Sequence, residues 1–190
     1  MEIALSVLVG IGLSAACGFR VFVPFLVASI AALSGHLSLS PGFEWIGTYY
    51  ALVAFAVATL LEILAYYVPW LDNLLDTIAT PVAVAAGVLI SASVIADMSP
   101  FLRWTLAAVV GGGTAGIVQA VTVAVRGASS VTTGGLGNPV VSTGELGGSA
   151  VIATLAVVLP IVAVVLVIVI AGSLGGLRRW SRRRSSGVHV

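Results

Sequence analysis

Four ionisable residues lie inside apolar stretches of this sequence or at their ends, and they are its first candidates for chemistry: Arg20, Glu62, Asp76 and Glu145. A charged side chain at membrane depth costs at least about 2.5 kcal/mol, so such residues usually mark a functional site. Apolar residues flank Arg20 on both sides. Because a guanidinium stays protonated at physiological pH, Arg20 needs a carboxylate, carbonyl oxygens or an anionic ligand.

Two interpretations of Arg20 stay open. In the first, Arg20 pairs with Glu62 or Asp76 and only locks two helices together. In the second, Arg20 binds an anion, such as a lipid phosphate or a small substrate, and an acid acts as a switchable counter-ion. Glu62 lies four residues before Tyr66, which predicts that both side chains share one helix face.

Asp72, Asp76 and Thr80 follow one another at a spacing of four. In a helix they would form one polar stripe, and two carboxylates one turn apart could share a proton or bind a hard cation. The alternative, which we favour, is a solvated face of an outer loop.

Residues 129–139 combine hydroxyl residues and glycines between two apolar stretches. This pattern is typical of a surface loop, or of a re-entrant loop that lines a watery cavity. Four residues within this segment or shortly after it are candidate ligand- or ion-binding residues: Asn138, Ser142, Thr143 and Glu145. Ser142 and Glu145 also have the spacing of a capping box at a helix start, so a cap and a ligand role are both open for Glu145.

The sequence shows no pattern of a metal site or of an enzyme. It has one cysteine, Cys17, and two histidines, His36 and His189, which are far apart. No cluster of His and Cys and no set of nucleophile, base and acid is visible. We therefore expect no metal, no cofactor and no enzymatic activity; an intramembrane enzyme acting on lipid is the weakest alternative.

Composition predicts an integral membrane protein. Apolar residues make up 59% of the chain and charged residues 8%, against roughly 25% charged in ordinary soluble domains. Residues 146–177 carry no charge, which exceeds the length of about 20 residues that one spanning helix needs. We expect one all-α domain over residues 1–177, followed by a disordered arginine-rich tail over residues 178–190.

We predict a polytopic bundle with about five spans, some of them broken or re-entrant: 3–33, 49–68, 77–96, 104–125 and 150–172, the last bent at Pro160. The five arginines after residue 177 predict a cytoplasmic C-terminus in a bacterial inner membrane. Five spans then place the connector 97–103 on the cytoplasmic side, and the N-terminus with the segments 69–76 and 126–149 on the opposite side. Two half-helices within 3–33, or re-entry of 69–81 or 129–149, would change this count.

Small residues recur every four positions at Gly10, Ser14 and Gly18, and again at Gly112 and Gly116. Such faces let helices approach closely, and we expect them to pack within the monomer, with a homo-oligomer as the alternative. The two halves of the chain also follow a similar order of glycine-rich helix, polar segment and long apolar helix. This order predicts an internal repeat, which in transporters indicates a binding site near the midplane.

Several of these segments together resemble a known family. Gly18-Phe19-Arg20, the Asp-containing middle segment and Gly137-Asn138-Pro139-Val140-Val141-Ser142-Thr143-Gly144-Glu145 are similar to a bacterial family of small membrane proteins, domain of unknown function family 4126. The resemblance covers most of residues 5–170 and leaves the arginine-rich tail outside. It implies a membrane location and helical architecture, and it implies no activity.

These observations predict a small transporter or channel for an ion, an anion or a lipid-linked substrate. The alternative is a non-transporting membrane subunit that assembles or stabilises a partner complex. The lipid bilayer is the expected partner, and we expect no nucleic acid.

Overall fold

The computed structural model describes residues 2–169, without the side chains of residues 2, 69–74, 76 and 77. Every regular element in this range is helical, so the predicted all-α class is confirmed. The elements are α1 (Glu2–Cys17), α2 (Phe22–Leu33), the 3-10 helix η1 (Glu44–Gly47), α3 (Tyr49–Ala65), α4 (Pro69–Val94), α5 (Pro100–Leu106), the π-helical turn η2 (Ala107–Gly112), α6 (Gly113–Thr133) and α7 (Asn138–Val158). A last helical segment covers Pro160–Val169.

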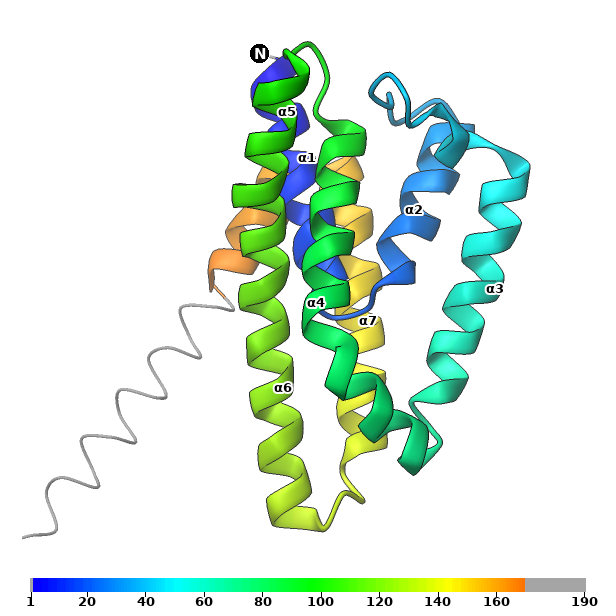
Figure 1. Cartoon of the computed structure of the whole chain (residues 1–190), viewed down its shortest axis with the longest axis vertical. Coiled ribbons are helices and arrows are strands. Elements are labelled where there is room, and N and C mark those ends of the chain that lie inside the picture. The colour runs from blue at the N-terminus through cyan, green and yellow to red at the C-terminus, as the bar shows by residue number, and fades with distance from the viewer. Residues whose placement is uncertain (1, 170–190) are drawn as a thin grey trace, which may run out of the picture.

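The first apolar stretch is a broken hairpin. α1 runs down from the N-terminus, the chain turns part-way down the bundle, and α2 runs back to the same end (Figure 1). At about 1.5 Å per residue, α1 is about 24 Å long and α2 about 18 Å, both shorter than a hydrocarbon core of about 30 Å. Residues 3–33 therefore form two half-helices and not one span.

This hairpin changes the predicted topology. The N-terminus lies at the same end of the bundle as the connector that precedes α5 (Figure 1). The turns between α3 and α4 and between α6 and α7 lie at the opposite end. The prediction that the N-terminus shares a side with residues 69–76 and 126–149 is thus wrong, because it counted α1 and α2 as one crossing.

Among residues 2–169, two helical stretches are long and apolar enough to cross a membrane: Pro100–Thr133, which joins α5, η2 and α6, and Asn138–Val158. Both support a membrane location. The other apolar helices have 10–17 residues each, so five spans are not confirmed. The predicted bend at Pro160 is in fact a break: α7 ends at Val158, and the new helical segment that starts at Pro160 turns back along the bundle (Figure 1). The described part of the predicted span 150–172 is therefore not one bent helix. The internal repeat stays a prediction.

The small-residue faces pack α1, α4 and α6 against one another. A Cβ added to Gly87 of α4 would lie 2.5 Å from Ala115 Cβ of α6. Ser14 of α1 donates to the Gly87 carbonyl at 2.8 Å, and its hydroxyl lies 2.8 Å from that of Ser91. The expected packing within the monomer is confirmed, and it fixes the helices around the break between α1 and α2.

Candidate functional site

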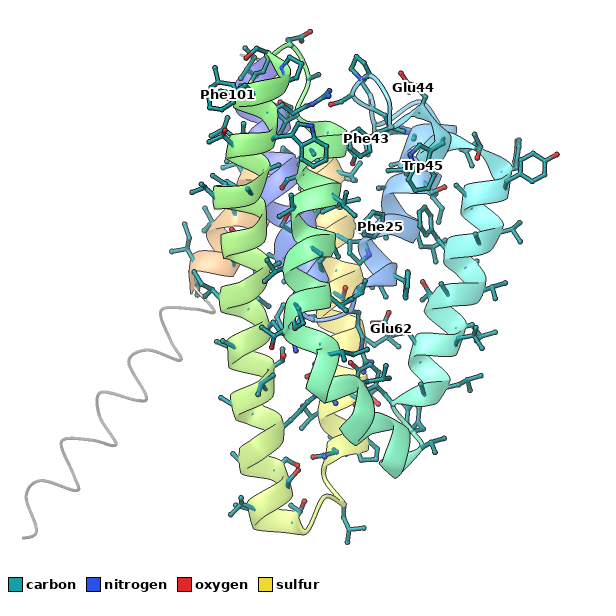
Figure 2. All side chains as sticks on the ribbon, in the orientation of Figure 1. Phe25, Phe43, Glu44, Trp45, Glu62 and Phe101 are labelled. Atoms are coloured by element: carbon teal, nitrogen blue, oxygen red, sulfur yellow. The ribbon has the colours of Figure 1, made fainter. Side chains whose placement is uncertain are left out.

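A cluster of charged and polar side chains gathers where the break between α1 and α2 meets α3, α6 and α7. We call it the charged cluster, and it consists of Arg20, Glu62, Tyr66, Arg126, Ser142 and Glu145. Figure 2 shows its member Glu62 on the side of α3 that faces the rest of the bundle. The sequence singled out Arg20, Glu62 and Glu145 together with Asp76, and the structure brings the first three together from the α1–α2 break, α3 and α7.

Arg126 and Glu145 form the firmest contact of the cluster. Arg126 Nε donates to Glu145 Oε1 at 2.9 Å, and Arg126 Nη2 donates to Glu145 Oε2. Both residues are buried, with 4% and 6% of their surface exposed. The two parallel hydrogen bonds match the planar fork of a guanidinium to a carboxylate, which is the strongest ion-pair geometry in proteins. This pair ties α6 to α7.

Arg20 is less completely satisfied than Arg126. Its Nη2 donates to the Ser142 carbonyl at 2.9 Å and lies 3.6 Å from Glu145 Oε2. Only 2% of Arg20 is exposed, yet no acceptor among the described residues reaches its Nε or Nη1. The Arg20 guanidinium carbon lies 3.7 Å from the centre of the Tyr66 ring, and that of Arg126 lies 4.3 Å from it. The ring face stabilises both cations. Arg20 Nε and Nη1 nevertheless stay without a hydrogen-bond acceptor in the described part of the chain.

Glu62 of α3 holds the start of α2. Its Oε1 accepts from the Val21 amide at 2.9 Å, and its Oε2 accepts from the Phe22 amide at 3.1 Å. The first amides of a helix have no partner inside that helix, and a carboxylate there also meets the positive end of the helix dipole. The expected ion pair between Arg20 and Glu62 is therefore wrong: among the described side chains, the acid within ion-pair distance of Arg20 is Glu145. The alternative pairing of Arg20 with Asp76 stays a prediction.

Other predicted site residues lie elsewhere or are not described. Asp72 and Asp76 belong to α4, but their side chains lie outside the described part of the structure, so their polar stripe stays a prediction. Thr143 is exposed and its hydroxyl lies 2.9 Å from that of Tyr67. Asn138 Nδ2 donates to Ser130 Oγ at 3.1 Å, across the turn that joins α6 to α7.

The region before Glu145 differs from both predicted forms. α6 continues to Thr133 and α7 starts at Asn138, so only residues 134–137 form a turn and residues 138–149 are helical. Ser142 and Glu145 lie inside α7, which rules out the capping role. Glu145 is instead the buried counter-ion of two arginines.

A cavity of about 380 Å³ adjoins the charged cluster. Its polar lining comes from Glu62, Tyr66 and Gln119, and most of the remaining lining is aliphatic or aromatic. Phe19 and Val21, the neighbours of Arg20 in the chain, also line it. The volume falls within the range of about 300–1,000 Å³ of small-molecule sites. Within residues 2–169, no group of three or more His, Cys, Asp or Glu residues is placed to hold a metal ion.

The family model that matches the chain is described as "Domain of unknown function (DUF4126)", and it covers residues 7–178. The chain belongs to this family. No curated protein and no solved structure gives a significant match. The resemblance drawn from the sequence is thus confirmed, and the function has to be argued from the site itself.

Sequence reasoning missed Arg126, which it placed in an outer segment. A usable signal was present: Arg126 lies eight residues before Gly134, and Glu145 lies eight residues after Gly137. Residues equidistant from a tight turn face one another across an antiparallel helix pair. This spacing is informative only if residues 134–137 are recognised as the turn. They were not, because the neighbouring hydroxyl residues and glycines are typical of a longer loop.

Proposed function

We propose that this chain is a small multi-pass membrane transporter or channel whose solute is an anion that binds at Arg20. Its two long apolar helices support a membrane location. So does the outer face of α3, where Val53, Val57, Leu60 and Leu64 are all more than half exposed. The arginine-rich tail favours a bacterial cytoplasmic membrane with the C-terminus inside the cell.

The observation that carries the proposal is the pair of unused donors on Arg20. A buried donor without an acceptor costs about 1–3 kcal/mol, and more when the group is charged. An arginine that only locked helices together would be expected to use all of its donors. Arg20 Nε and Nη1 find no acceptor among the described residues, and an anion would satisfy them.

The location of Arg20 adds support. It lies in the break between the two half-helices α1 and α2, part-way down the bundle (Figure 1). Known transporters often bind their substrates where a membrane helix is interrupted, because the broken backbone presents amides and carbonyls to the solute. Here the Val21 and Phe22 amides lie directly beside Arg20.

The alternative, a non-transporting subunit of a partner complex, rested on the density of small-residue faces. Gly10, Ser14 and Gly87 are used within the chain itself, so they no longer call for a partner. Affinity purification in mild detergent separates the two functions: a stoichiometric partner would favour the subunit, and its absence would favour the transporter.

The test is flux into liposomes reconstituted with the full chain, measured separately with chloride, acetate and inorganic phosphate. We expect flux of at least one of these anions, and we expect Arg20→Gln to abolish it. Arg103→Gln is the matched control: Arg103 is less buried than Arg20, its Nη1 donates to the Pro41 carbonyl, and its Nε also lacks an acceptor among the described residues. It therefore tests whether an unused donor outside the charged cluster affects flux. Equal flux through wild type and Arg20→Gln would contradict the proposal, provided that both elute as folded monodisperse protein.

A further inference from the structure

The cavity beside the charged cluster opens sideways. Leu61 of α3 and Ile78 and Val82 of α4 line it, and these three side chains are also exposed on the outer surface, Leu61 by 60%. Phe22 at the start of α2 lines it as well and is 37% exposed. The same apolar side chains thus form the wall of the cavity and the surface around it. In a membrane, this opening faces the lipid tails.

The inner end of the cavity is polar. Glu62 and Tyr66 line it, and both belong to the charged cluster. Glu62 accepts from the first amides of α2, and the Tyr66 ring lies against the Arg20 guanidinium. The cavity therefore runs from an apolar lateral entrance to Glu62 and Tyr66. Buried Arg20, with its two unused donor nitrogens, lies behind these residues against the Tyr66 ring and is not itself part of the described lining.

We propose that this cavity binds an amphiphilic anion, with a carboxylate or phosphate head at Arg20 and a hydrocarbon tail that points to the opening between α3 and α4. The proposal rests on the proposed function and specifies its substrate class. The head group accepts hydrogen bonds from Arg20 Nε and Nη1. It also replaces Glu62 as the acceptor of the hydrogen bonds from the Val21 and Phe22 amides. Glu62 thus occupies the head-group site with a carboxylate that belongs to the protein.

The surroundings favour an anion over a cation at this position. Helix starts bind anions because their free amides and the helix dipole are both positive, and the Glu62 carboxylate already demonstrates that the start of α2 accepts this chemistry. A ligand ammonium beside Glu62 would lie next to Arg20 and next to the positive end of α2. Apart from Glu62, the described cavity lining carries no charge, which suits a tail.

An anionic and a cationic ligand would respond in opposite ways to the substitution Glu62→Gln. Glu62→Gln removes a negative charge that competes with an anionic head, so we expect it to tighten binding of an amphiphilic anion at least about tenfold. The same change would weaken binding of an amphiphilic cation. Arg20→Gln should weaken the anion at least about tenfold, because charge-assisted hydrogen bonds are lost.

The experiment is equilibrium binding of radiolabelled probes to the full chain in nanodiscs of zwitterionic lipid, with empty nanodiscs subtracted. The probes are dodecanoate, dodecyl phosphate, dodecyltrimethylammonium and acetate. We expect saturable binding of dodecanoate or dodecyl phosphate, tighter in Glu62→Gln, weaker in Arg20→Gln and unchanged in Glu44→Gln, whose carboxylate is exposed far from the cavity. Comparing the first two probes identifies the preferred head.

A further variant tests the tail without touching a charge. Ala58 lines the cavity, and Ala58→Phe should reduce dodecanoate binding at least about tenfold while leaving acetate binding unchanged. This variant decides the matter if Glu62→Gln fails to fold.

Three outcomes would overturn the inference. Acetate binding as tightly as dodecanoate, with dependence on Arg20, would leave the proposed anion function standing and remove the tail. Saturable dodecyltrimethylammonium binding that Glu62→Gln abolishes would make the cavity a cation site. Dodecanoate and dodecyl phosphate binding that is indifferent to both Arg20 and Ala58 would rule out the cavity as their site.

Discussion

Replacing Glu145 by Gln removes the carboxylate that two buried guanidinium groups share. Arg126 makes two hydrogen bonds to it, and Arg20 Nη2 lies 3.6 Å from it. Removing one partner of a buried ion pair typically costs about 3–5 kcal/mol, because the remaining charge stays buried without compensation. For a chain of this length, 1 kcal/mol corresponds to about 2–4 °C in Tm. We therefore expect Glu145→Gln to lower Tm by roughly 6–20 °C.

The assay is thermal unfolding in non-ionic detergent, followed by the fraction of protein that still elutes as a monodisperse peak. Glu44→Gln is the matched control, since Glu44 is exposed and surface substitutions usually change stability by no more than about 0.5 kcal/mol. The double variant Arg126→Gln/Glu145→Gln should lose less than the sum of its single variants, because it removes charge from both sides. A Tm for Glu145→Gln within 2 °C, as a rough limit, of that for Glu44→Gln would refute the reasoning.

Two further predictions concern helix packing. Gly87→Val should prevent folding or severely lower the yield of folded protein, because the new Cβ alone would lie 2.5 Å from Ala115 Cβ. The control Gly113→Ala, whose Cβ would meet nothing within 4 Å, should elute like wild type in size-exclusion chromatography. Similar behaviour of the two variants would contradict the packing of α4 on α6. Tyr67→Phe removes one exposed hydrogen bond to Thr143, so we expect a loss of no more than about 1.5 kcal/mol in unfolding experiments, and a loss near that of Glu145→Gln would show that the charged cluster extends to this contact.

Helix positions were largely predictable from the sequence, because apolar stretches and aromatic ends mark them directly. Tyr49 opens α3 as predicted, and Pro160 starts the helical segment that follows the break after α7. The direction of the chain was harder to predict. Nothing local at Gly18–Val21 distinguishes a kink from a reversal. A contact that accompanies the reversal, between Glu62 and the start of α2, joins residues 41 positions apart.

The site was predictable by residue type and only partly by pairing. Arg20 and Glu145 stood out because charge is rare in apolar stretches, and both belong to the charged cluster. Their partners are set by tertiary contacts. The hydrogen bond from Arg20 to the Ser142 carbonyl, for example, joins residues 122 positions apart, and no local spacing predicts it. Arg126 was overlooked because its apparent neighbourhood looked like a polar loop, although it lies in α6.

The most direct test of the central claim, that Arg20 keeps donors free for an anionic head, is a solid-state NMR distance measurement. Protein labelled with ¹⁵N in arginine side chains and reconstituted in lipid would be saturated with dodecanoate carrying ¹³C in its carboxyl group. We predict a dipolar contact between that carboxyl carbon and the Arg20 side-chain nitrogens, identified by its loss in Arg20→Lys and its retention in Arg103→Lys. A contact that survives Arg20→Lys, or no contact in saturated wild-type protein, would contradict the account.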